Sequence, residues 1–408
     1  MTEAFIHTMT GNLGLIFRFL ILTLQFSQAC NAAFDESYQQ VKTGADQTAL
    51  YVHLLKGKAV GLVANHTTVI GYTHLADSLI KSGVDLKKIF APEHGFRGDA
   101  DAGAEIGNTV DLKTGIPVIS LYGSKTKPSA EDLKGIEIMV YDIQDVGVRF
   151  YTYISTLHYV MEACAASHIP LIVLDRPDPL GFYIDGPVLD PDYKSFVGMH
   201  PIPVVYGMTI GELAQMINGE GWLASGLKCD LSVILCSHYD HNTYYTLPIN
   251  PSPNLNCMEA IYLYPSLCFF EGTVMSLGRG TSFPFRVAGH PDYPVKTFSF
   301  VPVANSGNKD PKFRDKTCYG IDLRSNTIAQ LRQMKTLNLE WMVGAYKSMG
   351  LGEFFFTDYI DKLAGSDALR NQILSGAGEA QIRQSWEADL QKFKHIRKKY
   401  LIYKDFIP

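Results

Sequence analysis

A carboxylate and an imidazole directly follow a short apolar run in this chain. Residues 89–91 form the run, Pro92 ends it, and Glu93, His94 and Arg97 come next. A glutamate in such a loop has the chemistry of a general acid or base when it faces a cleft. We therefore predict that Glu93 is catalytic, that His94 orients it or binds substrate, and that Arg97 contacts substrate. The structural alternative is that Glu93 caps a helix or pairs with Arg97.

A second dense group of polar and aromatic residues lies between positions 142 and 153. Asp142 ends an apolar run, and we predict that its carboxylate is catalytic. Asp145 either contacts substrate or caps the following turn. Arg149 carries a planar guanidinium that can bind a carboxylate or phosphate through two hydrogen bonds, or it forms a salt bridge with a nearby aspartate. Tyr151 suits a platform for a sugar ring, although core packing explains it equally well.

Two carboxylates that face one cleft are the requirement for glycoside hydrolysis. The same carboxylates, together with His66 or His94, could instead hold a divalent metal ion in a metal-dependent hydrolase. The chain has no His-Glu-x-x-His motif, P-loop, Gly-x-Ser-x-Gly elbow or Cys-x-x-Cys pair. The corresponding site types are therefore disfavoured. Because no compact ligand motif is present, we predict a site without a metal and keep the metal-dependent hydrolase as the weaker alternative.

The elements that must position these residues alternate between strands and helices from about residue 58. Continuous apolar runs are typical of parallel strands buried on both faces, and the alternation indicates a parallel sheet with helices on both faces. We therefore predict an α/β protein with a Rossmann-like, doubly wound sheet; a single α/β barrel is the alternative. The predicted strands are 59–64, 89–91, 117–121, 136–142, 168–174 and 231–235, and the predicted helices between the first five are 73–82, 129–134 and 155–167.

Polar residues end several of these strands. The carboxyl ends of parallel strands share one edge of a sheet, and ligands bind at that edge. Asn65 follows the first predicted strand, and Asp175 and Arg176 follow the strand 168–174. We predict that these three residues contact substrate at the same edge as Glu93.

The length of 408 residues points to two domains, since one domain usually holds about 100–200 residues. We predict a Rossmann-like catalytic domain over residues 35–246 and a second α/β domain over 247–408. The second domain begins near a rigid turn at 251–254, and helical patterns dominate it at 326–348 and 379–399. A net charge of -5 without any Lys/Arg-rich run argues against a nucleic-acid partner.

Residues 1–34 are predicted to be an export signal. Residues 13–26 are nearly all apolar, with Arg18 ahead of the main hydrophobic run and small residues behind it. Cys30 follows the run, and its lipidation is the alternative to cleavage close to residue 32. We therefore expect an exported, periplasmic protein whose membrane attachment, if it has one, is a lipid anchor at Cys30.

Several of these motifs resemble the exo-β-N-acetylmuramidases of the NamZ family. The resemblance runs in order from about residue 50 to the C-terminus, which makes the match specific. It rests on Ala91-Pro92-Glu93-His94-Gly95-Phe96-Arg97-Gly98, on Tyr141-Asp142-Ile143-Gln144-Asp145-Val146-Gly147-Val148-Arg149-Phe150-Tyr151-Thr152-Tyr153, on Leu174-Asp175-Arg176-Pro177, on Pro251-Ser252-Pro253-Asn254 and on Glu271-Gly272-Thr273.

The resemblance implies a Rossmann-like domain that carries Glu93 and a smaller domain that closes the cleft. It also implies an exo-acting glycoside hydrolase that releases N-acetylmuramic acid from the non-reducing end of peptidoglycan fragments. The expected partner is a glycan or muropeptide, and no cofactor is implied. Glu93 inherits the catalytic role, Asn254 is expected to contact substrate, and Arg149 and Arg279 are expected to bind the lactyl carboxylate of the sugar.

The chain departs from the family pattern at Leu277, where relatives often carry a glutamate. The second catalytic carboxylate would then come from Asp142, Asp145 or Glu271. The same departure motivates a different class of function, an exported protein that binds a sugar or muropeptide without cleaving it. Release of free sugar from a chromogenic muraminide would separate the enzyme from this binding protein.

Overall fold

The computed structural model describes residues 40–93, 95–97 and 107–406. Contacts within the chain group Lys42–Pro408 into one compact unit. The predicted export signal, Cys30 and His94 lie outside the described residues. Within the described ranges, no helix has the length and apolar character needed to cross a membrane. The domain boundary between residues 246 and 247 stays a prediction.

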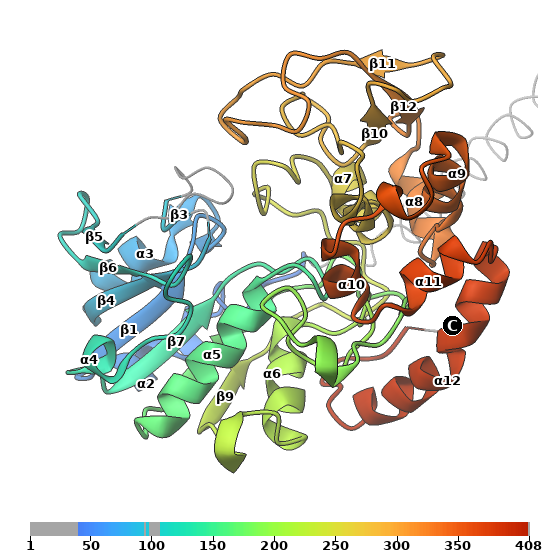
Figure 1. Cartoon of the computed structure of the whole chain (residues 1–408). Coiled ribbons are helices and arrows are strands. Elements are labelled where there is room, and N and C mark those ends of the chain that lie inside the picture. The colour runs from blue at the N-terminus through green and yellow to red at the C-terminus, as the bar shows by residue number, and fades with distance from the viewer. Residues whose placement is uncertain (1–39, 94, 98–106, 407–408) are drawn as a thin grey trace, which may run out of the picture. The chain divides into compact units, whose positions relative to one another are not determined.

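A seven-stranded sheet forms the centre of this unit (Figure 1). In spatial order its strands are β5 (Thr109–Val110), β6 (Pro117–Ser120), β4 (Asp85–Ala91), β1 (Ala59–Ala64), β7 (Ile138–Asp142), β8 (Leu171–Leu174) and β9 (Leu231–Ile234). All neighbours pair in parallel except β5, which runs antiparallel to β6. Because β5 and β9 each have one partner among the described strands, the sheet is open. The Rossmann-like prediction is confirmed, and the barrel alternative is wrong.

Alternate residues of the central strands enter two hydrophobic cores, because successive side chains of a strand point to opposite faces. In β7, Ile138 and Val140 join one core, and Met139 and Tyr141 join the other. Burial on both faces explains why the strands read as continuous apolar runs. The first core is covered by α2 (Val52–Leu55) and α3 (Leu75–Lys81), and the second by α4 (Ala130–Leu133), α5 (Tyr153–Ala166) and α6 (Ile210–Gly219).

A smaller second domain follows the sheet, in agreement with the predicted fold class. Its sheet is antiparallel and three-stranded, in the order β10, β12, β11. The predicted helix 326–348 is two helices, because Lys335 adopts a left-handed conformation with φ of 46° that ends the first. The elements are α7 (Met258–Leu267), the 3-10 helix η4 (Cys268–Gly272), β10 (Val287–His290), β11 (Ser299–Phe300), β12 (Cys318–Asp322), α8 (Ile328–Met334), α9 (Glu340–Met349), α10 (Tyr359–Ala364), α11 (Ala368–Leu374) and α12 (Glu379–Arg397); a small hairpin of β2 (Val69–Ile70) and β3 (Thr73–His74) belongs to the first domain.

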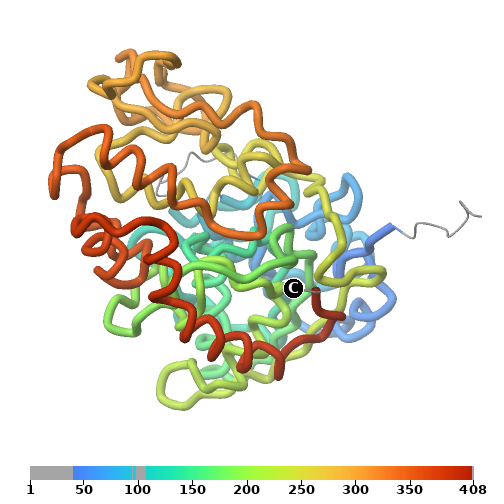
Figure 2. The backbone as a smooth tube through the Cα atoms, turned by 90° about the vertical axis from the view of Figure 1, so that its right-hand side faces the viewer, coloured from blue at the N-terminus to red at the C-terminus, as the bar shows by residue number. Residues whose placement is uncertain are grey.

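The C-terminal segment returns to the first domain. Figure 2 shows this red segment lying against green parts of the chain, and hydrogen bonds hold it there. The backbone N–H of Ile402 donates to the carboxylate of Glu212 at 2.9 Å, and the hydroxyl of Tyr403 donates to Asp175 at 2.6 Å. The C-terminal segment therefore completes the packing beside the first domain.

Candidate active site

A cavity of about 210 Å³ lies where the loop after β4 meets residues of the second domain. Its wall contains two glutamates, Glu93 and Glu271, one arginine, Arg279, and several aromatic side chains. Pockets for drug-sized ligands usually measure about 300–1,000 Å³, so this cavity suits a ligand of about one sugar ring. Aromatic faces and convergent charged groups are both suited to such a ligand.

Glu93 reaches the cavity from the loop that follows β4. The strand ends at Ala91, Pro92 cannot continue its hydrogen bonding, and a turn follows in which the Gly95 N–H donates to the Pro92 carbonyl at 3.1 Å. Gly95 has a φ of 73°, which glycine adopts without strain. Glu93 is half-buried and lines the cavity, as expected for a glutamate that faces a cleft.

Phenol groups surround the Glu93 carboxylate. Burial raises the pKa of the Tyr153 hydroxyl, and the charge of Glu93 raises it further. Burial likewise raises the pKa of Tyr359, with a contribution from the same glutamate. Both hydroxyls therefore stay protonated at neutral pH, and the Tyr153 hydroxyl donates to the Pro251 carbonyl at 3.5 Å.

Glu271 and Arg279 form an ion pair on the second-domain side of the cavity. Glu271 lies in η4, and its Oε1 atom accepts hydrogen bonds from Arg279 Nε at 2.9 Å and Nη2 at 2.5 Å. The guanidinium carbon lies 4.9 Å from the centre of the Phe285 ring. The exposed fractions of the two charged side chains are 29% for Arg279 and 25% for Glu271, so the pair remains open to a ligand. Of the three candidates for the second carboxylate, Glu271 is the one that lines the cavity.

Tyr151 and Asn254 also line the cavity, and both have internal partners. The Tyr151 hydroxyl donates to the Pro251 carbonyl at 2.8 Å, and its ring packs edge-on against Tyr153 at 4.8 Å. Asn254 Nδ2 donates to the Gly307 carbonyl at 3.1 Å. These bonds fix the side chains as rigid parts of the wall, and their predicted contacts with substrate stay predictions.

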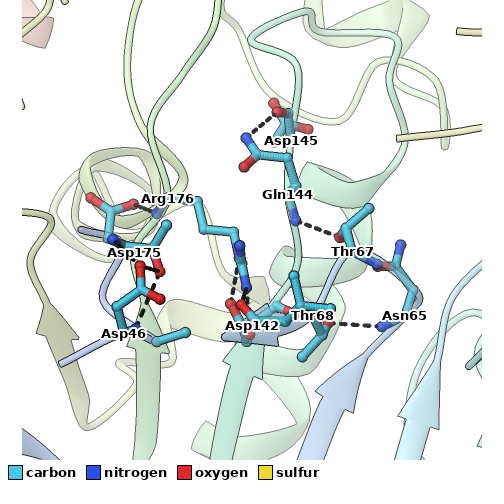
Figure 3. Close-up of polar contacts among 12 residues, drawn as sticks. Asp46, Asn65, Thr67, Thr68, Asp142, Gln144, Asp145, Asp175 and Arg176 are labelled. Carbon is cyan, nitrogen blue, oxygen red and sulfur yellow. Dashed lines mark hydrogen bonds and ion pairs between the residues drawn. The ribbon is translucent and has the colours of Figure 1, made fainter. Parts of the chain in front are cut away.

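Asp142 lies in a buried ion pair away from the cavity wall. Figure 3 shows the Arg176 guanidinium directed onto both oxygens of Asp142. Arg176 Nε donates to Oδ1 at 2.6 Å and Nη2 to Oδ2 at 2.9 Å, and the two side chains are 2% and 0% exposed. Burial raises the pKa of Asp142, and Arg176 opposes this rise. Neither residue has the access to ligand that the sequence prediction assumed, because each satisfies the other inside the protein.

Asp175 and Asp145 are also internal. Asp175 accepts hydrogen bonds from the Thr209 hydroxyl at 2.7 Å and from the Tyr403 hydroxyl. Asp145 accepts bonds from the Tyr206 hydroxyl and from the Gly147 N–H. Burial raises the pKa of both aspartates to about 6. Their positions do not suit substrate contact.

Arg149 and Arg97 do not line the cavity, and both bind other groups of the protein. Arg149 is fully buried, and its two terminal nitrogens donate to four backbone carbonyls at 2.6–2.8 Å, those of Pro187, Ile202, Leu363 and Ala364. Burial lowers the pKa of Arg149 to about 9. Arg97 pairs with Asp111 at 2.9 Å and with Asp77 at 3.3 Å. Arg149 is therefore buried outside the cavity wall with both terminal nitrogens bound to carbonyls, and this geometry gives no support to its predicted binding of the lactyl carboxylate.

Asn65 and Leu277 are buried outside the cavity wall. Asn65 Oδ1 accepts bonds from the backbone and hydroxyl of Thr67, at 2.9 and 2.6 Å, so it closes the turn after β1. Leu277 is 4% exposed. Sequence reasoning missed Tyr264, Phe285 and Tyr359 as cavity residues. The Tyr264-Pro265 pair offered some signal, whereas nothing in the sequence around Phe285 and Tyr359 distinguishes them from core aromatics.

No group of three or more His, Cys, Asp or Glu side chains among the described residues is arranged to hold a metal ion. His66, a possible ligand by its place after β1, instead shares a hydrogen bond with the Asn250 carbonyl through Nε2 at 2.9 Å.

Sequence models of one protein family match most of the chain. The model described as exo-β-N-acetylmuramidase NamZ, N-terminal, matches residues 60–259, and the corresponding C-terminal model matches residues 262–403. The first match contains the sheet and Glu93, and the second contains Glu271 and Arg279. The cavity thus draws residues from both matched regions.

Individual proteins are similar over nearly the whole length. The chain is 39% identical to the peptidoglycan β-N-acetylmuramidase NamZ of Bacillus subtilis strain 168, over 95% of this chain and 99% of that protein. A crystal structure of a DUF1343 family protein from Bacteroides fragilis NCTC 9343 superposes with a TM-score of 0.84 at 45% identity, over 90% of this chain and all of that one. A second protein of that family and organism gives 0.74 at 29% identity, covering 89% and 99%.

Proposed function

We propose a residue-level mechanism for this chain, which belongs to the exo-β-N-acetylmuramidase NamZ family and is a glycoside hydrolase. The enzyme releases N-acetylmuramic acid from the non-reducing end of peptidoglycan fragments, and Glu93 is the general acid. The observation that carries the assignment is that Glu93 lines a cavity of about one-sugar size with aromatic walls. The family models and the 39% identity confirm the resemblance seen in the sequence at the level of the family.

Glu93 donates its proton to the glycosidic oxygen as the bond between that oxygen and the anomeric carbon breaks. Water supplies the hydroxyl group of the released sugar. A positioned general acid contributes about 10²–10⁴-fold to the rate of such a step. The protonated Tyr359 hydroxyl donates a hydrogen bond to a sugar oxygen, and the aromatic rings of the wall pack against the sugar ring. A small cavity favours a terminal sugar over the interior of a glycan chain.

A chromogenic muraminide tests this mechanism directly. Wild-type protein is expected to release nitrophenol and free N-acetylmuramic acid from 4-nitrophenyl β-N-acetylmuraminide. A folded protein that binds the sugar but releases nothing would favour the binding-protein alternative. Release that a chelator abolishes and a divalent ion restores would favour the metal-dependent hydrolase.

We also propose that the chain is exported to the periplasm, with residues 1–34 as its signal. The apolar run 13–26 behind few charged residues supports this assignment. Mass spectrometry of the mature N-terminus in a fractionated cell is the measurement that checks it. A lipid-modified Cys30 at the new N-terminus would establish the anchor, cleavage close to residue 32 would exclude it, and an intact cytoplasmic chain would contradict export.

A further inference from the structure

We propose that Arg279 selects muramic acid over other N-acetylhexosamines, by binding the lactyl carboxylate with the guanidinium edge that Glu271 leaves open. This inference rests on the proposed function and assigns the specificity of the same site. N-Acetylmuramic acid differs from N-acetylglucosamine by a lactyl ether, and the carboxylate of that ether carries the added charge. A site that distinguishes the two sugars therefore needs a cationic partner for that group.

The cavity contains one such partner. Arg279 is the single Lys, Arg or His among the described residues that line it. The other arginines predicted to bind substrate are engaged elsewhere, Arg149 by four carbonyls and Arg176 by Asp142. The cavity also holds the carboxylate of Glu271, which would repel an anionic substituent placed beside it. Arg279 is consequently the position in the wall where a substrate carboxylate is electrostatically stabilised.

The hydrogen bonds of Arg279 leave the required donors available. A guanidinium has five N–H groups in a rigid planar fork. Glu271 Oε1 takes the Nε donor and one Nη2 donor, both on one edge of the fork. No interaction in the described part of the chain engages Nη1. The opposite edge, formed by Nη1 and the second Nη2 hydrogen, can therefore bind a carboxylate through two parallel hydrogen bonds.

Two neighbours hold the guanidinium plane in place. Glu271 fixes one edge, and the Phe285 ring lies under the guanidinium at 4.9 Å. The exposed fraction of 29% shows that the arginine is neither sealed in the core nor free in solvent. An arginine that is orientated before binding loses little side-chain entropy when a ligand arrives. Glu271 is accordingly a positioning residue that acts through Arg279.

The test compares enzyme variants and substrates in pairs. The substrates are 4-nitrophenyl β-N-acetylmuraminide and the same compound with its lactyl carboxylate converted to the methyl ester, which removes the charge. Wild-type kcat/KM is expected to fall about 100-fold on esterification, because two charge-assisted hydrogen bonds are lost. Arg279→Gln should lose about 100-fold on the acid and change little on the ester. Arg279→Lys should recover part of the preference for the acid, since it keeps the charge without the planar fork.

Matched variants separate recognition from a general defect. Arg370 is paired with Asp361 at 2.8 Å, is 31% exposed and does not line the cavity, so Arg370→Gln should leave both substrates unaffected. Glu271→Gln should weaken the preference for the acid over the ester, because Arg279 then loses the partner that fixes its orientation. Equal losses on both substrates in Arg279→Gln would overturn the proposal. An unchanged preference for the acid in Glu271→Gln would overturn the positioning role of Glu271.

A binding measurement keeps this inference distinct from the proposed function. Calorimetric titration of free N-acetylmuramic acid and N-acetylglucosamine into the Glu93→Gln variant needs no catalysis. The acid sugar should bind more tightly, and the added substitution Arg279→Gln should remove the difference. If wild-type protein cleaves neither chromogenic substrate, the proposed function fails, and the titration still decides the role of Arg279. An unchanged sugar preference in the double variant would refute that role.

Discussion

Two arginine–carboxylate pairs stand in opposite environments in this protein. Arg176 and Asp142 share two parallel hydrogen bonds at 2% and 0% exposure, at the end of the central sheet. Arg279 and Glu271 share one carboxylate oxygen at 29% and 25% exposure, in the wall of a cavity. The first pair is sealed inside the protein, where Arg176 Nη2 also donates to the Val69 carbonyl at 3.2 Å, whereas the second pair is partly exposed in a cavity wall. The type of residue does not distinguish a structural pair from a recognition pair; exposure does.

We call Glu271 and Arg279 the open pair, and Asp142 and Arg176 the closed pair. The largest effect is expected from replacing Glu93, the acid in the same cavity wall as the open pair. Glu93→Gln cannot donate the proton, so we expect kcat to fall by about 10²–10⁴-fold on a glycan fragment with terminal N-acetylmuramic acid, because its sugar leaving group needs that proton and 4-nitrophenolate does not. The matched control is Glu131→Gln, because the Glu131 side chain is 83% exposed on α4 and away from the cavity. Unchanged kcat in Glu93→Gln would assign the acid to another residue.

Breaking the closed pair should reduce stability instead of catalysis. Asp142→Asn leaves the Arg176 charge buried without compensation, which usually costs about 3–5 kcal/mol. Urea unfolding measures this loss, and kcat per folded molecule should remain close to wild type. For the open pair, Glu271→Gln should cost about 1 kcal/mol or less, because exposed pairs contribute little. If the two stability losses were reversed, exposure would be the wrong criterion for separating the pairs.

The buried carboxylates near the closed pair should make stability depend on pH. Burial raises the pKa of Asp145 and of Asp175 to about 6. Because the folded pKa exceeds the unfolded value, each contribution is fully present below about pH 4 and is lost as pH rises through about 6, up to about 3 kcal/mol each. Asp145→Asn removes one of the two groups.

Thermal or urea unfolding between pH 4.5 and pH 7 checks this expectation. The decrease in unfolding free energy over that range should be smaller in Asp145→Asn than in wild type, by up to about 3 kcal/mol. An identical decrease in both proteins would mean that Asp145 keeps an ordinary pKa in the folded state.

The smallest expected effect concerns the ring under the open pair. Phe285→Leu removes a cation–π contact of about 0.5–1 kcal/mol, so the preference for the acid over the ester substrate should fall about two- to fivefold. Phe298→Leu is the matched control, because the Phe298 ring lies 4.8 Å from the guanidinium of Arg324, outside the cavity wall. A similar fall in Phe298→Leu would indicate a general packing effect.

The sheet followed from local patterns to a large extent. The apolar run 59–64 coincides with β1, and the run 136–142 contains β7. Strand positions are predictable here because strands that are buried on both faces appear in the sequence as continuous apolar runs. The beginning of β8 was less predictable: His168 has a φ of 55° and stands in a turn before the strand begins at Leu171. A positive φ at a non-glycine residue has no reliable signature in sequence.

The candidate site was predictable only in part. Glu93, Tyr151, Asn254 and Arg279 line the cavity, as their motifs suggested. The polar residues at the ends of β7 and β8 do not, because their partners, such as Tyr403 for Asp175, come from distant parts of the chain. Strand-end position brings polar groups to one edge of the sheet, but it does not say which of them satisfy one another there.

By itself, the sequence determined the parallel sheet, the family and the position of Glu93 after a strand, because each depends on residues that are close together along the chain. Only the tertiary structure decided which carboxylate and which arginine accompany Glu93. Glu271 and Arg279 come from the second domain, about 180 residues away, and their proximity depends on how α7 and η4 pack. The closed pair of Asp142 and Arg176 and the open pair of Glu271 and Arg279 contain the same two functional groups, and burial alone gives them different properties.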